Sequence, residues 1–179
     1  MGLEEIKTLL QQHGLSPNKL LGQNFMTEFS LYPKLANCAL VGKEDVVLDA
    51  GAGFGFLSIF LADKCKKVIA VEKDPAVAQV LRRQVASLSN VGVIEGDILK
   101  VPLPSFNKAI SIPPYYLSSQ LVVWLLGKSF ESAVLIVQKE FAKRLVASVG
   151  SDEYGWLSVV TYQAADAELL DEVPRWMFH

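Results

Sequence analysis

Val46-Val47-Leu48-Asp49-Ala50-Gly51-Ala52-Gly53-Phe54-Gly55 is the stretch that says most about how this chain folds. It begins as a hydrophobic strand, passes into a glycine-rich turn and continues into the apolar segment 56–61. Glycine lets a backbone turn tightly and approach a ligand that side chains would otherwise keep away. We therefore expect a strand, a turn and a helix in succession. The turn either binds a ligand or is simply a tight connection.

The spacing of the glycines narrows the class of ligand. Gly51, Gly53 and Gly55 form a Gly-x-Gly-x-Gly pattern. A dinucleotide fingerprint would place its third glycine one residue later, at Phe56, so a nicotinamide or flavin cofactor is disfavoured. The pattern is more typical of the turn that holds the methionine part of S-adenosylmethionine in class I methyltransferases.

Length and composition describe a single well-packed domain. The chain has 179 residues, of which 51% are hydrophobic, enough for a large core. Its apolar runs, such as 133–137, are far too short to cross a bilayer, and its start lacks the pattern of a secretory signal. Two cysteines and two histidines predict neither a disulfide framework nor a metal site. We expect a cytoplasmic protein with no metal, and by default a monomer.

The net charge of −2 counts mildly against nucleic acid as a partner, because binding to phosphates usually requires a basic surface. Basic residues gather only locally, at Lys64, Lys66 and Lys67, at Arg82 and Arg83, and at Lys139, Lys143 and Arg144. Each group on its own is more typical of a solvated face than of a phosphate site.

Strand and helix patterns alternate through most of the chain. Strands are predicted at Val46–Ala50, Val68–Val71, Val91–Ile94, Ala109–Ile112 and Ala133–Val137. Helices are predicted at Phe56–Asp63, Pro75–Leu88, Ser118–Leu126 and Gln138–Ser148. Such alternation predicts an α/β, Rossmann-like fold with a mostly parallel sheet and helices on both faces. The last two segments, Leu157–Ala165 and Ala167–Phe178, are predicted to be strands that complete a seven-stranded sheet.

Two helices are predicted before the first strand, at Leu3–Gln12 and at about Thr27–Leu40. Thr27 is a candidate N-cap and Pro33 a possible break in the second helix. Residues 1 to about 40 therefore form a helical extension of a catalytic domain that spans 1–179.

Acidic residues follow two of the predicted strands, where a parallel sheet binds its ligands. Glu72 closes the second strand, and its carboxylate can accept hydrogen bonds from both hydroxyls of a ribose. The alternative role of capping the next helix suits Asp74 better. Asp97 follows the third strand and can accept from an adenine amine, with Ile98 as an apolar edge. Gly96-Asp97 can equally be an ordinary turn.

The fourth strand leads into Ser111-Ile112-Pro113-Pro114-Tyr115-Tyr116. The prolines remove two backbone donors and leave carbonyls as the available polar groups. A tyrosine that stacks on a flat base, beside carbonyls that accept from its amine, would form a clamp for a nucleobase. A proline-terminated strand followed by a core aromatic is an equally good interpretation of this motif alone.

Several further segments resemble one family, the ribosomal RNA adenine dimethyltransferases, which include the kasugamycin-sensitivity enzymes of the small subunit and the erythromycin-resistance methylases. The matching segments are Leu21-Gly22-Gln23-Asn24-Phe25-Met26, Val137–Leu145 with its Gln-Lys-Glu-x-Ala-x-Arg pattern, Tyr154–Val159 and Val173–His179. They occur in the family's order from about Leu20 to the end of the chain.

The resemblance implies transfer of methyl groups from S-adenosylmethionine to adenine amines in small-subunit ribosomal RNA, giving dimethyladenosine within an assembling ribosomal particle. It implies a cofactor site formed by Gln23, Asn24, Phe25, Asp49, Gly51, Gly53, Glu72, Lys73, Asp97, Ile98 and Ser111. It implies a catalytic site formed by Ile112, Pro113, Pro114, Tyr115 and Phe178, with Tyr115 and Phe178 on either side of the target base.

Two departures from the family pattern affect these expectations. Ile112 stands where the family has an asparagine that accepts from the target amine, so we expect reduced activity; the Ser111 hydroxyl could take that role only in a shifted register. The family's C-terminal helical domain is absent from the sequence, which predicts weak RNA binding. Alternatives are a cofactor-binding ribosome-assembly factor with little catalysis, an adenine methyltransferase of large-subunit RNA, and a methyltransferase of DNA adenine or protein glutamine.

Overall fold

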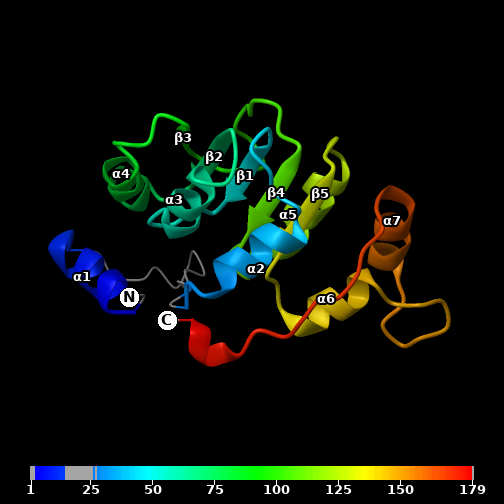
Figure 1. Ribbon diagram of the computed structural model, residues 1–179. Helices are drawn as coiled ribbons and strands as arrows, with labels where there is room; N and C mark the ends of the chain where they lie inside the picture. Colours follow the sequence, from blue (N-terminus) through cyan, green and yellow to red (C-terminus); the bar gives the residue numbers. More distant parts are fainter. Residues whose placement is uncertain (1–2, 15–25, 27, 179) are drawn as a thin grey trace.

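The centre of the molecule is a parallel five-stranded sheet with the order β3-β2-β1-β4-β5 (Figure 1). The computed structural model describes residues 3–14, 26 and 28–178. The strands are β1 (Val46–Ala50), β2 (Lys67–Glu72), β3 (Val91–Glu95), β4 (Lys108–Ser111) and β5 (Ser132–Leu135). The strand order reverses between β1 and β4, and in such sheets ligands bind beyond the carboxyl ends of the strands at this switch point.

Helices cover both faces of the sheet. On one face lie α2 (Leu31–Cys38), α3 (Phe56–Ala62) and α4 (Pro75–Gln84), with α1 (Leu3–Gln12) packed on the outside of α4. On the other face lies α5 (Ser118–Leu126). Beyond β5, α6 (Lys139–Leu145) packs against α7 (Trp156–Ala164) (Figure 1). The parallel sheet with helices on both faces is therefore confirmed.

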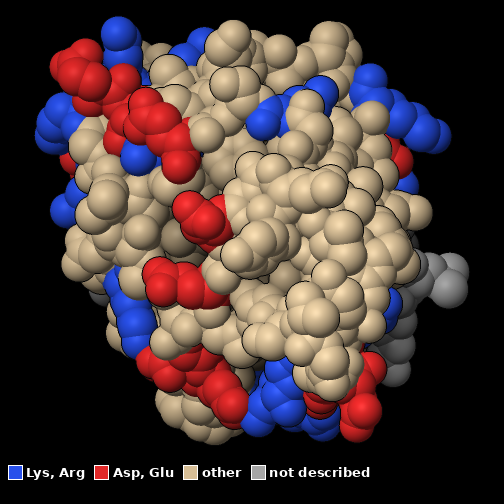
Figure 2. Space-filling model, turned by 90° about the vertical axis from the view of Figure 1, so that its right-hand side faces the viewer, with Lys and Arg blue, Asp and Glu red and all other residues tan. Residues whose placement is uncertain are grey.

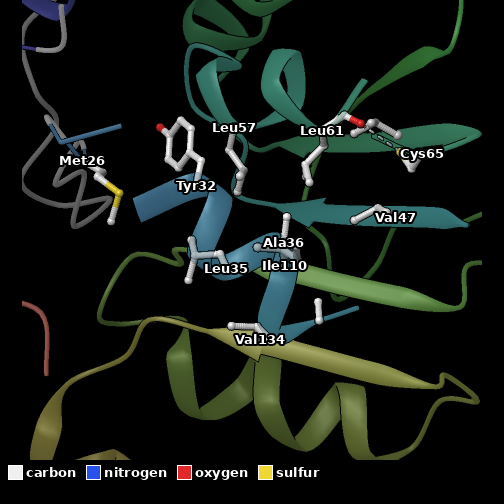
Figure 3. Close-up of a cluster of buried hydrophobic side chains, with 12 residues drawn as sticks. Met26, Tyr32, Leu35, Ala36, Val47, Leu57, Leu61, Cys65, Ile110 and Val134 are labelled. Atoms are coloured by element: carbon white, nitrogen blue, oxygen red, sulfur yellow. Dashed lines mark hydrogen bonds between the residues drawn. The ribbon is translucent and has the colours of Figure 1, made fainter. Parts of the chain in front are cut away.

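Successive side chains along each strand point to opposite faces of the sheet, so the core is divided between the two faces. Val47 of β1 and Ile110 of β4 face α2, where they meet Tyr32 and Leu35 (Figure 3). Leu48, the next residue of β1, faces α5 and packs in the cluster that contains Leu121. Because both faces are buried, the strands are nearly continuous in hydrophobic residues, as is typical of parallel sheets.

The prediction of seven strands was wrong for the described residues, because Leu157–Ala165 lies in helix α7. Leu157, Ser158 and Thr161 are buried on one side of α7, while Val159 and Tyr162 are exposed. Buried positions spaced by one, three and four residues follow a helix and not a strand. The β-branched run 159–161 favours a strand locally, but packing against α5 and α6 favours a helix.

The segment 167–178 was also predicted as a strand, and here the structure has an irregular chain. It contains the short 3-10 helix η2 (Arg175–Met177) and one isolated antiparallel bridge between Phe178 and Met26. Lys34 of α2 forms an ion pair with Asp171 on this segment. The bridge joins the C-terminal segment to Met26, which precedes α2 in the chain, and the C-terminal end of the chain lies below α2 in Figure 1.

The predicted second helix is shorter than expected. It begins at Leu31 and ends at Cys38, with Ser30 before it, and Thr27 lies outside the described residues. Pro33 does not break α2 because it occupies the first turn, where a backbone N–H has no partner within the helix. Along the described part of the chain, none of the helices has the length and hydrophobicity needed to cross a bilayer.

Candidate active site

The glycine turn joins β1 to α3 at the switch point of the sheet. The backbone N–H groups of Gly51 and Ala52 both donate to the Val71 carbonyl, at 2.8 and 3.0 Å. Gly51, Gly53 and Gly55 have φ values of +79°, +56° and +88°, in the left-handed region that glycine adopts at little cost. The turn therefore needs its glycines for conformation as well as for close approach.

Gly51 brings the turn against the proline motif. A Cβ atom added to Gly51 would lie 3.3 Å from Cδ of Pro114 and 4.0 Å from Cα of Pro113. These two motifs are more than sixty residues apart in the sequence, but β1 and β4 are neighbours in the sheet. The structure therefore unites the predicted cofactor turn with the predicted base clamp.

Glu72 at the end of β2 holds the glycine turn in place. Its Oε2 accepts from the Gly53 N–H at 2.9 Å, and its Oε1 accepts from the Asp74 N–H at 2.8 Å. Burial raises the pKa of Glu72 above its usual value, although these backbone N–H groups act in the opposite direction. Each carboxylate oxygen keeps a second lone pair, so Glu72 can support the turn and still accept from a ligand.

Asp49 lies in β1 directly before the turn and is almost fully buried. Its carboxylate accepts a hydrogen bond from Oγ of Ser58 at 2.6 Å. Burial raises the pKa of Asp49 to about 7, and the nearby Glu72 carboxylate acts in the same direction, against the Ser58 hydrogen bond. Ser58 was not predicted as a site residue, although a polar residue inside the apolar helix α3 is the signal that could have identified it.

Lys73, Asp97 and Tyr116 meet beside the ends of β2 and β3. Lys73 Nζ donates to Oδ2 of Asp97 at 3.2 Å and lies 5.9 Å from the centroid of the Tyr116 ring. Burial alone would raise the pKa of Asp97, but the Leu99 N–H and the Lys73 ammonium lower it overall. Asp97 is therefore an ionised acceptor near the mouth of the site, with Tyr116 as a neighbour that the sequence did not predict.

Ile98 is separated from this cluster because its side chain is 3% exposed and packs in the core cluster beneath α5. Asp74 caps α4, because its Oδ1 accepts from the N–H of Ala76 at 2.9 Å. The structure thus places Asp74 in the capping role and leaves Glu72 at the site.

The proline motif presents two backbone carbonyls. The Pro114 carbonyl accepts from the Leu117 N–H at 2.9 Å, where α5 begins. The carbonyls of Ile112 and Pro113 accept no hydrogen bond from the described residues. Carbonyls were expected to be the available polar groups of this motif; the Pro114 carbonyl is engaged by α5, and a ligand role for those of Ile112 and Pro113 stays a prediction.

The side chains of the motif point in different directions. Ser111 is buried and its hydroxyl donates to the Ala50 carbonyl, so it joins β4 to β1. Ile112 is partly buried and packs against the cluster beneath α2, as does Phe178. Tyr115 is 44% exposed, so part of the residue is accessible to a ligand. Gln23, Asn24 and Phe25 lie outside the described residues.

A family described as "Ribosomal RNA adenine dimethylase" matches residues 14–179. The chain belongs to this family. Among curated proteins, the "Probable ribosomal RNA small subunit methyltransferase A" of Thermococcus onnurineus is 40% identical over 176 residues, which are 98% of this chain and 64% of that protein. This chain thus spans slightly less than two thirds of the length of that curated relative.

Two solved structures are similar in sequence and in fold. A dimethyladenosine transferase from Plasmodium falciparum has a TM-score of 0.69 at 32% identity, over 74% of this chain and 50% of that one. The 23S rRNA methyltransferase ErmE has a TM-score of 0.64 at 30% identity, over 70% of this chain and 52% of that one. The fold of this chain therefore agrees with its membership of the dimethylase family.

Proposed function

We propose that this chain transfers methyl groups from S-adenosylmethionine to the exocyclic amine of adenines in small-subunit ribosomal RNA. The observation that carries the proposal is the close approach of Gly51 to Pro113 and Pro114, which leaves little room for a Cβ atom, in a member of the dimethylase family. That contact joins a turn suited to the methyl donor to a motif suited to the acceptor. The curated relative from Thermococcus onnurineus, named for the small subunit, supports this substrate, and a ribosomal substrate favours a cytoplasmic location.

The residues at the switch point fit the donor. A Cβ at Gly51 would fill the space beside Pro114, and Glu72 and Asp97 offer carboxylate oxygens at neighbouring strand ends. We assign Asp49, Gly51, Gly53 and Ser111 to the methionine end, Glu72 to the ribose, and Asp97 with Lys73 to the adenine. When bound, S-adenosylmethionine supplies a methyl group on a positively charged sulfur.

The proline motif fits the acceptor. The carbonyls of Ile112 and Pro113, which accept no hydrogen bond from the described residues, can accept from an exocyclic amine, which orients the nitrogen lone pair toward the donor. The exposed ring of Tyr115 can stack on the target base, and Phe178 lies on the same side of the sheet as Ile112. Catalysis then depends on positioning and on polar groups directed at the reacting nitrogen.

One observation favours a second candidate function, a cofactor-binding factor of ribosome assembly with little catalysis. The Ile112 side chain packs into the core cluster beneath α2, and it offers no polar atom to the target amine. Such a factor would keep the donor site and lose most of the transfer rate.

A transfer assay with labelled S-adenosylmethionine separates these candidates. The acceptors are small ribosomal subunits that lack adenine methylation, large subunits, adenine-containing DNA and a glutamine-containing peptide, and cofactor binding is measured in parallel. We expect label in the small subunits above all other acceptors. Cofactor binding without transfer to any acceptor would favour the assembly factor, and label mainly in another acceptor would overturn the proposed substrate.

A further inference from the structure

A groove lies outside the site described above, between α6, the loop 146–155 and the start of α7. Its volume is about 410 Å³, within the range of sites that bind small ligands. It is lined by Glu140, Lys143, Arg144, Asp152, Glu153, Tyr154, Gly155 and Leu157. Figure 2 shows the side of the molecule that carries α7, a broad surface with few charges whose charged side chains gather at its borders.

Five charged side chains line this groove without neutralising one another. Lys143 and Arg144 supply two cations, and Glu140, Asp152 and Glu153 supply three carboxylates. Among the described residues, no ion pair joins any of them, whereas the neighbouring Lys139 pairs with Glu172 at 2.6 Å. Donors and acceptors are thus both available to a ligand.

The walls of the groove are held in place by hydrogen bonds. Oγ of the buried Ser158 donates to the Arg144 carbonyl at 2.7 Å and accepts from the Gly155 N–H at 3.3 Å. The Tyr154 N–H donates to the Ser151 carbonyl at 3.1 Å, and the Tyr154 side chain is 39% exposed. The end of α6 and the start of α7 are therefore tied together, with an accessible aromatic ring between them.

Helix α6, which lines the groove, follows β5 in the chain, and β5 pairs with β4, which leads into the proline motif. The N–H of Ile136, just after β5, donates to the Ser111 carbonyl at the start of the proline motif, at 3.0 Å. Glu140 follows four residues later, a separation of at most about 14 Å along the chain. An RNA strand whose adenine occupies the active site can therefore extend toward α6.

We propose that this groove binds a nucleotide that neighbours the target adenine, with a preference for guanine; this inference rests on the proposed function. Lys143 and Arg144 would contact the phosphate, and Tyr154 would stack on the base. A carboxylate among Glu140, Asp152 and Glu153 would accept from the two adjacent N–H groups of the guanine Watson–Crick edge. The groove has three carboxylates and two cations. We therefore expect it to disfavour an anion that offers no N–H donors to the carboxylates.

The first test measures binding of nucleotides to the whole chain and does not depend on activity. Guanosine 5′-monophosphate is compared with uridine 5′-monophosphate, which presents only one such N–H group, by calorimetry and by tyrosine fluorescence. We expect tighter binding of the guanine nucleotide, and we expect that Tyr154→Ala weakens it about tenfold or more. One of Glu140→Gln, Asp152→Asn and Glu153→Gln should abolish the preference over uridine.

The second test measures methyl transfer to small subunits. Tyr154→Ala and Lys143→Ala should each raise KM at least several-fold and leave kcat unchanged. The matched controls are Tyr162→Ala, which removes an exposed ring from the far end of α7, and Arg83→Ala, which removes one positive charge from α4; both should leave KM within twofold. Circular dichroism checks that each variant is folded.

The outcomes separate this inference from the proposed function. Absence of transfer by the unsubstituted chain contradicts the proposed function, while the nucleotide binding still reports on the groove. Equal binding of both nucleotides, or an unchanged KM in active Tyr154→Ala and Lys143→Ala variants, overturns the nucleotide site. Binding of an arginine-containing peptide in preference to either nucleotide overturns it in favour of a protein partner.

Discussion

At the scale of single residues, Ile112 has the most direct bearing on activity. An asparagine at this position would place an amide oxygen where isoleucine has only carbon. We predict that Ile112→Asn raises the turnover of methyl transfer by about 10²-fold or more, because the side chain gains an acceptor for the target amine. Single-turnover assays with saturating S-adenosylmethionine measure this change.

The same substitution should reduce stability, because Ile112 packs against the cluster beneath α2. We expect a loss of about 1–2 kcal/mol in the free energy of unfolding, measured by urea denaturation. Ile112→Val, which keeps an apolar branched side chain, is the control and should leave turnover unaltered. If Ile112→Asn binds the cofactor but gains no turnover, the residue does not limit the reaction.

The raised pKa of Asp49 leads us to expect that the stability of the fold depends on pH. Its folded-state pKa of about 7 exceeds the ordinary value of 3.8 because the carboxylate is buried. The folded state therefore holds the proton more tightly, and the stabilisation is fully present below about pH 4 and is lost as the pH rises to about 7. The difference between the two pKa values corresponds to at most about 4 kcal/mol.

Asp49→Asn should remove this contribution while keeping an oxygen that accepts from Ser58. Urea unfolding of both proteins at pH 5 and pH 8 measures the effect. We expect the variant to gain stability relative to the unsubstituted chain as the pH increases. A constant difference between the two proteins across this range would contradict a raised pKa at Asp49.

At the scale of elements, the glycine turn depends on two separate properties of Gly51. It has a positive φ, and its α-carbon approaches Pro114. Gly150 has a φ of +90°, and none of the described residues lies within 4 Å of a Cβ atom added there, so Gly150→Ala introduces the backbone strain alone. We expect each alanine to cost about 1–2 kcal/mol of stability.

Gly51→Ala should in addition displace the proline motif by a few tenths of an ångström and weaken cofactor binding at least tenfold. Calorimetric titration with S-adenosylhomocysteine compares the two variants. If Gly150→Ala and Gly51→Ala bind it equally, then the contact between the turn and the proline motif does not shape the donor site.

Helix α7 offers a test of its packing. Oγ1 of Thr161 is buried and has no hydrogen-bond partner among the described residues. Thr161→Val keeps the shape of the side chain and removes the unsatisfied hydroxyl, so we expect a gain of about 1 kcal/mol in stability. Thermal and urea unfolding measure it, and a clear loss would show that this hydroxyl is hydrogen-bonded in the folded protein.

At the scale of the whole molecule, the sequence predicted the parts that depend on local pattern. The run 46–55 specifies a strand and a tight glycine-rich turn by its own composition, and the β–α alternation specifies a parallel sheet. Residues 157–165 were predicted wrongly because Val159 and Val160 favour a strand locally, whereas the helix depends on contacts with α5 and α6. The irregular segment 167–178 likewise depends on long-range contacts, such as the bridge to Met26.

In the candidate site, too, the features that depend on local pattern were predicted and those that depend on packing were not. The positions of Glu72 and of the proline motif at strand ends followed from the strand pattern. The contact between Gly51 and Pro114, the double hydrogen bonding of Glu72 and the burial of Ile98 beneath α5 did not, because they depend on how separate strands and helices pack.

The most direct test of the central claim identifies the product of the reaction. Small ribosomal subunits that lack adenine methylation are incubated with the chain and S-adenosylmethionine, and their RNA is digested to nucleosides for mass spectrometry. We predict dimethyladenosine that increases with time and is absent without the chain. Bound S-adenosylmethionine without any methylated adenosine would contradict the account.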